Sequence, residues 1–128
     1  IMEIKWGLVP DMSGPQRLQR LLRPDQIKAL TFTGRIVSGE EAVTLGLATE
    51  TAADPLAAAQ TMARTIAKQS PDAIRAAKRL IEQIPTLSVA AGLALEAQEQ
   101  QKLIGSPNQM EAVMANMQKR EPSFGDPS

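Results

Sequence analysis

The chain contains neither cysteine nor histidine among its 128 residues. Thiol nucleophiles, thiolate metal sites, disulfides and imidazole bases are therefore excluded within it. Aromatic side chains are limited to Trp6, Phe32 and Phe124, which is fewer than a self-contained α/β domain usually holds. Acid–base chemistry consequently falls to carboxylates, with lysine as the remaining option.

Net charge and long apolar runs are absent as well. The chain carries 14 basic and 14 acidic residues. It therefore offers no electrostatic attraction for nucleic acid or an anionic membrane, and we expect neither as a partner. No run of about 18 apolar residues is present to span a bilayer. The lack of cysteine agrees with a cytoplasmic location, which is our expectation.

Helix signals dominate what is present. Hydrophobic residues make up 43% of the chain, enough to bury a core. Polar residues that cap a helix, followed by proline at its first position, predict helices from Asp54-Pro55, Ser70-Pro71 and Ser106-Pro107. A capping box of Ser38 and Glu41 predicts another helix that ends at Gly46.

The remaining elements follow from apolar spacing. The longest helix is expected at about residues 86–104, after Pro85 and before Gly105. Shorter helices are expected at residues 16–22 and from Pro24 onward. Brief extended segments are expected at residues 2–4 and 47–51. The sequence therefore predicts about seven helices and almost no sheet.

Two carboxylates differ from the other acidic residues. Most of the 14 acidic side chains lie on polar faces of predicted helices, where such charges are usually solvated. Glu3 and Asp11 instead lie in a hydrophobic stretch rich in glycine and proline. A carboxylate beside apolar groups holds its proton more tightly, which suits proton transfer to carbon. From residue types alone, Glu3 as an ordinary strand-edge charge and Asp11 as a turn residue remain open interpretations.

Three stretches form ordered motifs. Residues 3–18 read Glu-Ile-Lys-Trp-Gly-Leu-Val-Pro-Asp-Met-Ser-Gly-Pro-Gln-Arg-Leu, and residues 30–42 read Leu-Thr-Phe-Thr-Gly-Arg-Ile-Val-Ser-Gly-Glu-Glu-Ala, with Leu-Gly-Leu at 45–47. Residues 119–124 read Lys-Arg-Glu-Pro-Ser-Phe. In order and spacing these motifs resemble the signatures of the enoyl-CoA hydratase/isomerase (crotonase) superfamily. The resemblance covers essentially the whole chain, which leaves little room for chance similarity.

This resemblance implies a fold and a partner. The family's fold is an α/β crotonase spiral of repeated ββα turns, and this chain resembles its mainly α C-terminal half. Residues 1–53 are then expected to be the end of the spiral core with an active-site loop. Residues 54–128 are expected to be a helical region that builds a homo-oligomer, a trimer or a dimer of trimers. The implied substrate is an acyl-CoA, and no metal or cofactor is implied beyond the CoA thioester itself.

The resemblance also implies roles for individual residues. In hydratases of the family, two backbone N–H groups stabilise an enolate, and two glutamates handle a water and the α-carbon proton. Glu3 matches the second glutamate and is expected to be the general acid/base. Lys119 matches a lysine that approaches the CoA 3′-phosphate, with a solvated helix-end charge as the competing interpretation. Further contacts with the substrate are implied for Trp6, Pro10, Met12 and Phe124.

Departures from the family pattern leave the reaction open. Asp11 and Ser13 each stand where the signature has glycine. An acidic residue eight positions after the glutamate is similar to dienoyl-CoA isomerases, where a third carboxylate joins the proton-shuttling pair. The oxyanion donors and the first carboxylate belong to an earlier half of the fold that this sequence lacks. We therefore predict a parent enoyl-CoA hydratase, with a dienoyl-CoA isomerase using Glu3 and Asp11, or an inactive truncated assembly module, as alternatives.

Overall fold

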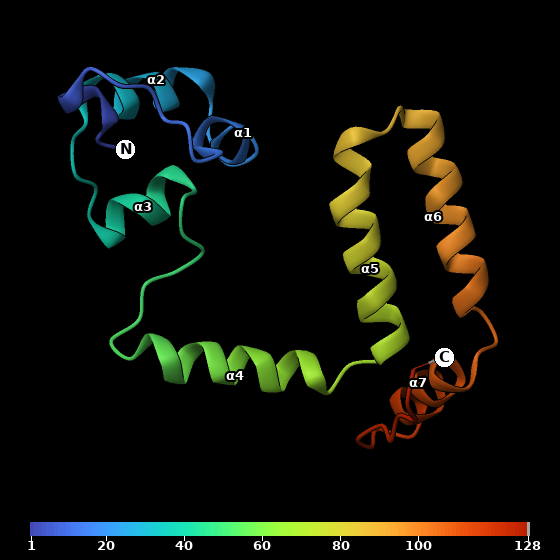
Figure 1. Cartoon of the computed structure of the whole chain (residues 1–128). Coiled ribbons are helices and arrows are strands. Elements are labelled where there is room, and N and C mark those ends of the chain that lie inside the picture. The colour runs from blue at the N-terminus through green and yellow to red at the C-terminus, as the bar shows by residue number, and fades with distance from the viewer. Residues whose placement is uncertain (128) are drawn as a thin grey trace. The chain divides into compact units, whose positions relative to one another are not determined.

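The computed structural model describes residues 1–127. The chain divides into two compact units, unit 1 from Ile1 to Pro55 and unit 2 from Leu56 onward. Every regular element in residues 1–127 is helical, as the sequence predicts, and Figure 1 shows the elements in chain order. No helix in this part of the chain is both long enough and apolar enough to cross a membrane.

Unit 1 consists of one short 3-10 turn and three helices. They are η1 (Glu3–Trp6), α1 (Gly14–Leu18), α2 (Pro24–Thr33) and α3 (Gly39–Leu45). Leu22 and Leu30 are its buried apolar side chains. Helix α1 ends earlier than the predicted residue 22, because the amides of Arg20 and Leu21 donate to carbonyls three residues back and tighten the chain into turns.

The extended segment that we expected at residues 2–4 is wrong, because this stretch curls into η1. The Lys5 N–H donates to the Met2 carbonyl at 3.0 Å, and the Leu8 N–H donates to the Glu3 carbonyl at 3.1 Å. Gly7 closes the turn in the left-handed conformation at φ 68°. Local hydrogen bonds thus satisfy the backbone without a neighbouring strand.

The extended segment expected at residues 47–51 is also wrong. The amides of Leu47 and Ala48 both donate to the Ala42 carbonyl, at 2.8 and 3.2 Å. The chain therefore folds back over the last turn of α3, where Gly46 adopts a left-handed conformation as predicted. In residues 1–127 there is no strand with which this segment pairs.

Unit 2 contains the longer helices. They are α4 (Pro55–Ala67, whose first residue closes unit 1), α5 (Pro71–Gln83), η2 (Ile84–Thr86), α6 (Val89–Leu103) and α7 (Pro107–Met117). Helices α5 and α6 pack side by side as an antiparallel hairpin (Figure 1). Ala76 of α5 and Ala115 of α7 are buried.

Serine caps set the helix starts in unit 2. The hydroxyls of Ser70, Ser88 and Ser106 each accept a backbone N–H from the residue three positions on. The starts predicted at Ser70-Pro71 and Ser106-Pro107 are confirmed. The longest helix begins at Val89 rather than near residue 86, because Ile84–Thr86 form η2 and Ser88 provides the cap.

Large apolar side chains remain exposed in both units. In unit 2 they include Leu56 and Met62 of α4, Ile81 of α5, and Val89 and Leu93 of α6. Helix α4 has no buried residue at all. Scattered exposed apolar side chains are ordinary on a protein surface, but a helix without any buried residue leaves its apolar side chains unpacked within this unit.

Candidate active site

Glu3 lies at the start of η1, and its carboxylate has unused hydrogen-bonding capacity. The Glu3 backbone is fixed, since its carbonyl accepts the Leu8 N–H. One carboxylate oxygen, Oε2, is buried and has no hydrogen-bond partner among the described residues. A buried carboxylate oxygen without a partner is costly and calls for an explanation such as a catalytic role. Glu3 is therefore the predicted site residue whose carboxylate has an unsatisfied buried oxygen in residues 1–127.

The loop after η1 carries three more of the predicted residues. Pro10 is half-buried and lies 3.6 Å from the point that a Cβ on Gly14 would occupy. Asp11 is exposed, and Met12 is 87% exposed. Trp6 of η1 is also exposed. Unit 1 thus brings Glu3 and Asp11 into one short segment, although no hydrogen bond joins their side chains in the part of the chain described.

Backbone strain marks this loop. Ser13 adopts the left-handed conformation at φ 63°, which residues with a side chain rarely occupy. Lys119 in unit 2 does the same at φ 54°. Within residues 1–127 these are the two non-glycine residues with positive φ; Lys119 is a predicted site residue, and Ser13 directly follows Met12, which is another. Strained backbone of this type gathers at ligand-binding positions.

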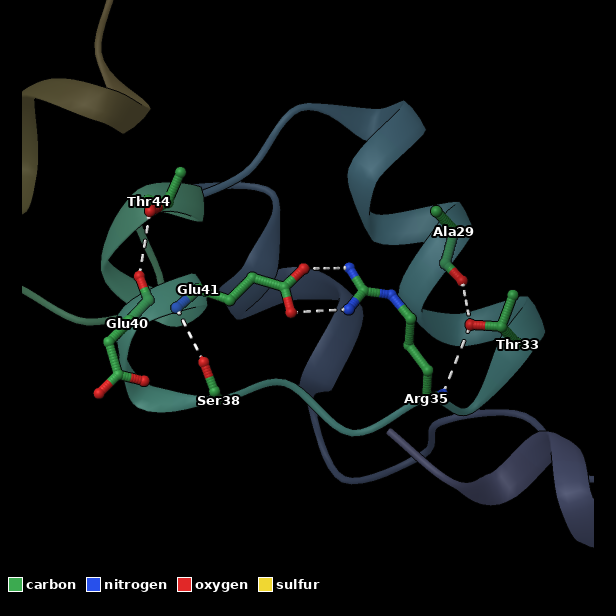
Figure 2. A network of polar contacts seen from close by, with 7 residues as sticks. All are labelled: Ala29, Thr33, Arg35, Ser38, Glu40, Glu41 and Thr44. Carbon is green, nitrogen blue, oxygen red and sulfur yellow. Dashed lines mark hydrogen bonds and ion pairs between the residues drawn. The ribbon is translucent and has the colours of Figure 1, made fainter.

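A polar network joins the end of α2 to α3 (Figure 2). The Arg35 guanidinium donates to both carboxylate oxygens of Glu41, at 2.9 and 2.7 Å. The Glu41 N–H donates to the Ser38 hydroxyl at 3.1 Å, which confirms half of the predicted capping box. The other half is wrong, because the Glu41 carboxylate binds Arg35 rather than reaching back. Arg35 also lowers the pKa of the Glu41 carboxyl.

The predicted residues of unit 2 line a single groove. Lys119 and Phe124 lie there with two further cations, Lys68 and Arg120, around a volume of about 530 Å³. Pro122 and the small side chain of Ala112 contribute apolar surface. Two of these cations are ion-paired: Lys68 lies 3.7 Å from Glu121, which also lines the groove, and Arg120 is paired with Glu111. Sequence analysis missed Lys68 and Arg120, although Arg120 directly follows Lys119 in the closing motif.

The wall of this groove is held by a carboxylate clamp. Arg120 donates to both oxygens of Glu111, at 2.6 and 2.9 Å, and the Ser123 N–H donates to Glu111 at 2.7 Å. The guanidinium first, then the backbone N–H, lowers the pKa of Glu111 to about 2. Helix α7 and the segment after it are thereby joined.

Buried polar groups hold the rest of unit 2. Asn108 is 5% exposed; its amide donates to Asp72 at 2.7 Å and to the Gly125 carbonyl at 3.2 Å, and it accepts the Gly125 N–H at 2.9 Å. Glu99 is 3% exposed and binds Arg79 of α5 and, at 2.6 Å, Lys102. Arg79 and then Lys102 lower the pKa of Glu99. Neither buried residue was identified from the sequence.

Two sets of site residues therefore result. Unit 1 holds Glu3, Trp6, Pro10, Asp11 and Met12, and unit 2 holds Lys119 and Phe124. In residues 1–127 no three side chains of the metal-binding types gather closely enough to hold a metal ion.

Comparisons with known proteins agree with the motifs. The family described as "Enoyl-CoA hydratase/isomerase" matches residues 1–127. The human "Enoyl-CoA hydratase domain-containing protein 2, mitochondrial" is 34% identical over 97% of this chain and 44% of its own length. The "Enoyl-CoA isomerase/hydratase fer4" of Mycosarcoma maydis is 34% identical over 95% of this chain and 45% of its own length.

Solved structures agree as well. The enoyl-CoA hydratase of Bacillus anthracis superposes with a TM-score of 0.89 at 31% identity, over 96% of this chain and 48% of that protein. EchA1 of Mycobacterium marinum, also an enoyl-CoA hydratase, gives a TM-score of 0.88 at 29% identity, over 97% of this chain and 50% of that protein. The chain thus spans about half the length of the proteins it resembles. It belongs to the enoyl-CoA hydratase/isomerase family and forms the mainly helical C-terminal portion of the crotonase fold.

Proposed function

We propose that this segment acts within an acyl-CoA enzyme that hydrates a 2-enoyl-CoA, with Glu3 as the general acid/base. The observation that carries the proposal is the buried, unpartnered Oε2 of Glu3, at the motif position where hydratases hold a glutamate. Relatives that are named enoyl-CoA hydratases support the reaction type.

The proposed reaction adds water across the C2=C3 bond of the thioester. The water oxygen bonds to C3, one proton of that water passes to a carboxylate, and a carboxyl group delivers a proton to C2. Glu3 serves the proton at C2, since a positioned acid/base contributes typically 10²–10⁴-fold to such a transfer. The backbone donors that stabilise the enolate come from the rest of the fold, outside this chain.

The groove of unit 2 is assigned to the CoA moiety of the substrate. Lys119 is assigned to the phosphates of CoA, and Phe124 offers a ring face for the adenine, while Arg120 holds the groove wall through Glu111. Trp6, Pro10 and Met12 are assigned to the acyl end, because the exposed Trp6 and Met12 and the half-buried Pro10 give apolar surface near Glu3 in the sequence that suits an acyl chain. The thioester supplies its own activation, so we propose no metal or redox cofactor.

Self-association is part of the proposal. The exposed apolar side chains of α4, α5 and α6 are buried against another copy of the protein, in a trimer or a dimer of trimers. The cytoplasm remains our expected location, although the names of two relatives place them in the mitochondrion.

A second candidate reaction rests on Asp11. Its carboxylate lies eight residues after Glu3 in the same loop, which is the arrangement of a dienoyl-CoA isomerase. There, one carboxylate would remove a proton from the dienoyl chain and the other would return a proton to a different carbon. Two close carboxylates share their protons as a coupled pair.

The experiment compares turnover of an enoyl-CoA and a 3,5-dienoyl-CoA by the complete protein and three variants. Glu3→Gln should lower the preferred activity by about 10²–10⁴-fold. The control Glu50→Gln changes an exposed carboxylate of unit 1, unlike the partly buried Glu3, and should leave turnover unaltered. Unchanged turnover in Glu3→Gln would remove the acid/base assignment.

Asp11→Asn separates the two reactions. In a hydratase, Asp11 contributes mainly its backbone, so the loss should stay under about tenfold. In an isomerase, its charge takes part in proton transfer, so dienoyl turnover should fall by about 10²-fold or more. If Asp11→Asn strongly lowers dienoyl turnover, and the wild type does not hydrate the enoyl-CoA, the protein is an isomerase and not a hydratase.

A further inference from the structure

Gly34 has two separate reasons to be glycine. It follows α2 in the left-handed conformation at φ 58°, and its N–H donates to the Leu30 carbonyl at 3.0 Å. It is also buried against η1, so an added Cβ would lie 3.2 Å from Ile4 Cγ2 and 3.4 Å from Lys5 Cε. Gly105 has a positive φ of 79° but nothing within 4 Å of its Cβ position. The contact with η1 is therefore particular to Gly34.

The turn that contains Gly34 is anchored on both sides, as Figure 2 shows. The Thr33 hydroxyl donates to the Ala29 carbonyl at 2.7 Å, and the Arg35 N–H donates to that hydroxyl at 3.4 Å. The Arg35 guanidinium donates two parallel hydrogen bonds to the Glu41 carboxylate. This geometry fixes the relative orientation of the two side chains as well as their distance. Because α2 and α3 hold this turn, a Cβ added at Gly34 requires Ile4 of η1, rather than the turn, to shift by a few tenths of an ångström.

Displacement of η1 reaches the proposed catalytic carboxylate directly. Ile4 follows Glu3 within the single turn of η1, and α2 and η1 pack together. We propose that Gly34, held by the Arg35–Glu41 ion pair, is a positioning residue that sets where η1 presents the Glu3 carboxylate. Its catalytic consequence rests on the hydratase function proposed above, whereas its effect on η1 does not.

The first experiment compares Gly34→Ala with Gly105→Ala in the complete protein. Both variants place a side chain at a positive φ, but only Gly34→Ala also pushes on Ile4. A misplacement of about 1 Å costs roughly 10²-fold in rate, and a shift of a few tenths of an ångström at Ile4 should cost correspondingly less. We expect Gly34→Ala to lower kcat by about fivefold to tenfold with KM nearly unchanged, and Gly105→Ala to leave both constants unaltered. Equal constants in the two variants would overturn the proposal.

A double-mutant cycle with Ile4→Ala tests whether the contact is the cause. Ile4→Ala removes the Cγ2 atom that the methyl group introduced by Gly34→Ala would strike. The loss of kcat caused by Gly34→Ala should then shrink to less than about threefold in the Ile4→Ala background. The same loss in both backgrounds would mean that the contact does not position Glu3.

Hydrogen–deuterium exchange reads the position of η1 without any activity assay. The amides of Lys5, Gly7 and Leu8 are hydrogen-bonded within this turn. They should exchange at least about fivefold faster in Gly34→Ala and at the wild-type rate in Gly105→Ala. Unaltered exchange in Gly34→Ala would overturn the proposal. If exchange responds as expected but Glu3→Gln retains full turnover, the positioning of η1 stands and the proposed reaction fails.

If Gly34→Ala does not fold, Ile4→Ala alone tests the contact, because it changes the residue of η1 that faces Gly34. It loosens η1 while Gly34 keeps its conformation. Faster exchange of the η1 amides and a lower kcat are then expected, and wild-type values for both would overturn the proposal.

Discussion

The two units of the chain are held by different kinds of polar contact. In unit 1, the Arg35–Glu41 pair joins residues six positions apart, and both side chains are about 40% exposed. In unit 2, Glu99 and Asn108 are buried, and their contacts with Arg79, Asp72 and Gly125 join residues 17 to 36 positions apart. Unit 2 thus uses buried charge and amide groups as cross-links between helices, whereas unit 1 uses local turns.

The two units also differ in whether their buried carboxylates have hydrogen-bonding partners. The carboxylates of Glu99 and Glu111 in unit 2 are matched by cations or N–H donors, which lower their pKa values and keep them charged. The carboxylate of Glu3 in unit 1 keeps a buried oxygen without a partner among the described residues. A matched group stabilises a fold, and an unmatched one is available for chemistry.

The largest effect that tests this comparison is expected from Glu99→Gln. The amide keeps the shape of Glu99 but places a buried neutral group against Arg79 and Lys102, and both half-exposed cations lose the anion that joins α5 to α6. We expect Tm to fall by about 10 °C or more in a circular dichroism melt. Exchange should accelerate in α5 and α6 but not in α2 and α3. Equal acceleration in both units would contradict their separate stabilisation, and Glu96→Gln on the exposed side of α6 is the matched control.

Asn108→Ala should produce the second largest effect. It leaves the Gly125 N–H and carbonyl without their side-chain partner, at a cost of about 2 kcal/mol in the free energy of unfolding. Because Phe124 precedes Gly125, the groove should lose its ring and bind CoA more weakly, which calorimetry measures directly. The control Asn116→Ala removes an exposed amide that lines the same groove. Equal CoA affinity in wild type and Asn108→Ala would mean that the docked tail plays no part in binding.

Acid should weaken unit 2 through Glu111. Its pKa of about 2 lies below the ordinary value of 4.5, so the folded state favours the ionised form. The stabilisation is complete above pH 4.5 and is lost as the pH falls towards 2. Urea unfolding between about pH 6 and pH 2 should therefore show a steeper decline in the wild type than in Glu111→Gln. Parallel curves for the two proteins would contradict the assignment of this clamp.

Ser13→Gly should change stability least, and it should raise the free energy of unfolding rather than lower it. Glycine removes the penalty of a side chain at φ 63°, which raises the free energy of unfolding of unit 1 by about 1 kcal/mol. The comparison variant Ser106→Gly, at an ordinary φ of −68°, should instead cost a few tenths of a kcal/mol because it loses a helix cap. Destabilisation by Ser13→Gly would show that the serine side chain, and not the backbone, matters in this loop.

The helix starts in unit 2 could be predicted from local sequence signals. The buried polar contacts between its helices could not. Ser70-Pro71 and Ser106-Pro107 carry the information for a helix start within a few residues, so the sequence predicts them. Glu99 looks like a surface charge on the polar half of its helix. Only the approach of Arg79 from another helix, 20 positions away, makes it a buried anion.

The same limit explains the errors in unit 1. Apolar residues around Glu3 favour a strand by composition, but the carbonyls of Met2, Glu3 and Ile4 find donors within the next few residues and form η1 instead. Glu3 and Asp11 themselves were singled out by their apolar, glycine-rich surroundings and by the family motif. Lys68 was missed because its place in the groove depends on how α4 meets the segment after α7, which no local pattern encodes.

The most direct test of the proposed chemistry follows the transferred proton itself. Crotonyl-CoA is hydrated in deuterium oxide by the complete protein, and nuclear magnetic resonance records the rate at which deuterium appears at C2 of the product. With Glu3 as the acid/base, Glu3→Gln slows this incorporation by about 10²–10⁴-fold while the affinity for CoA stays at the wild-type value. Incorporation at the wild-type rate in Glu3→Gln would contradict the account.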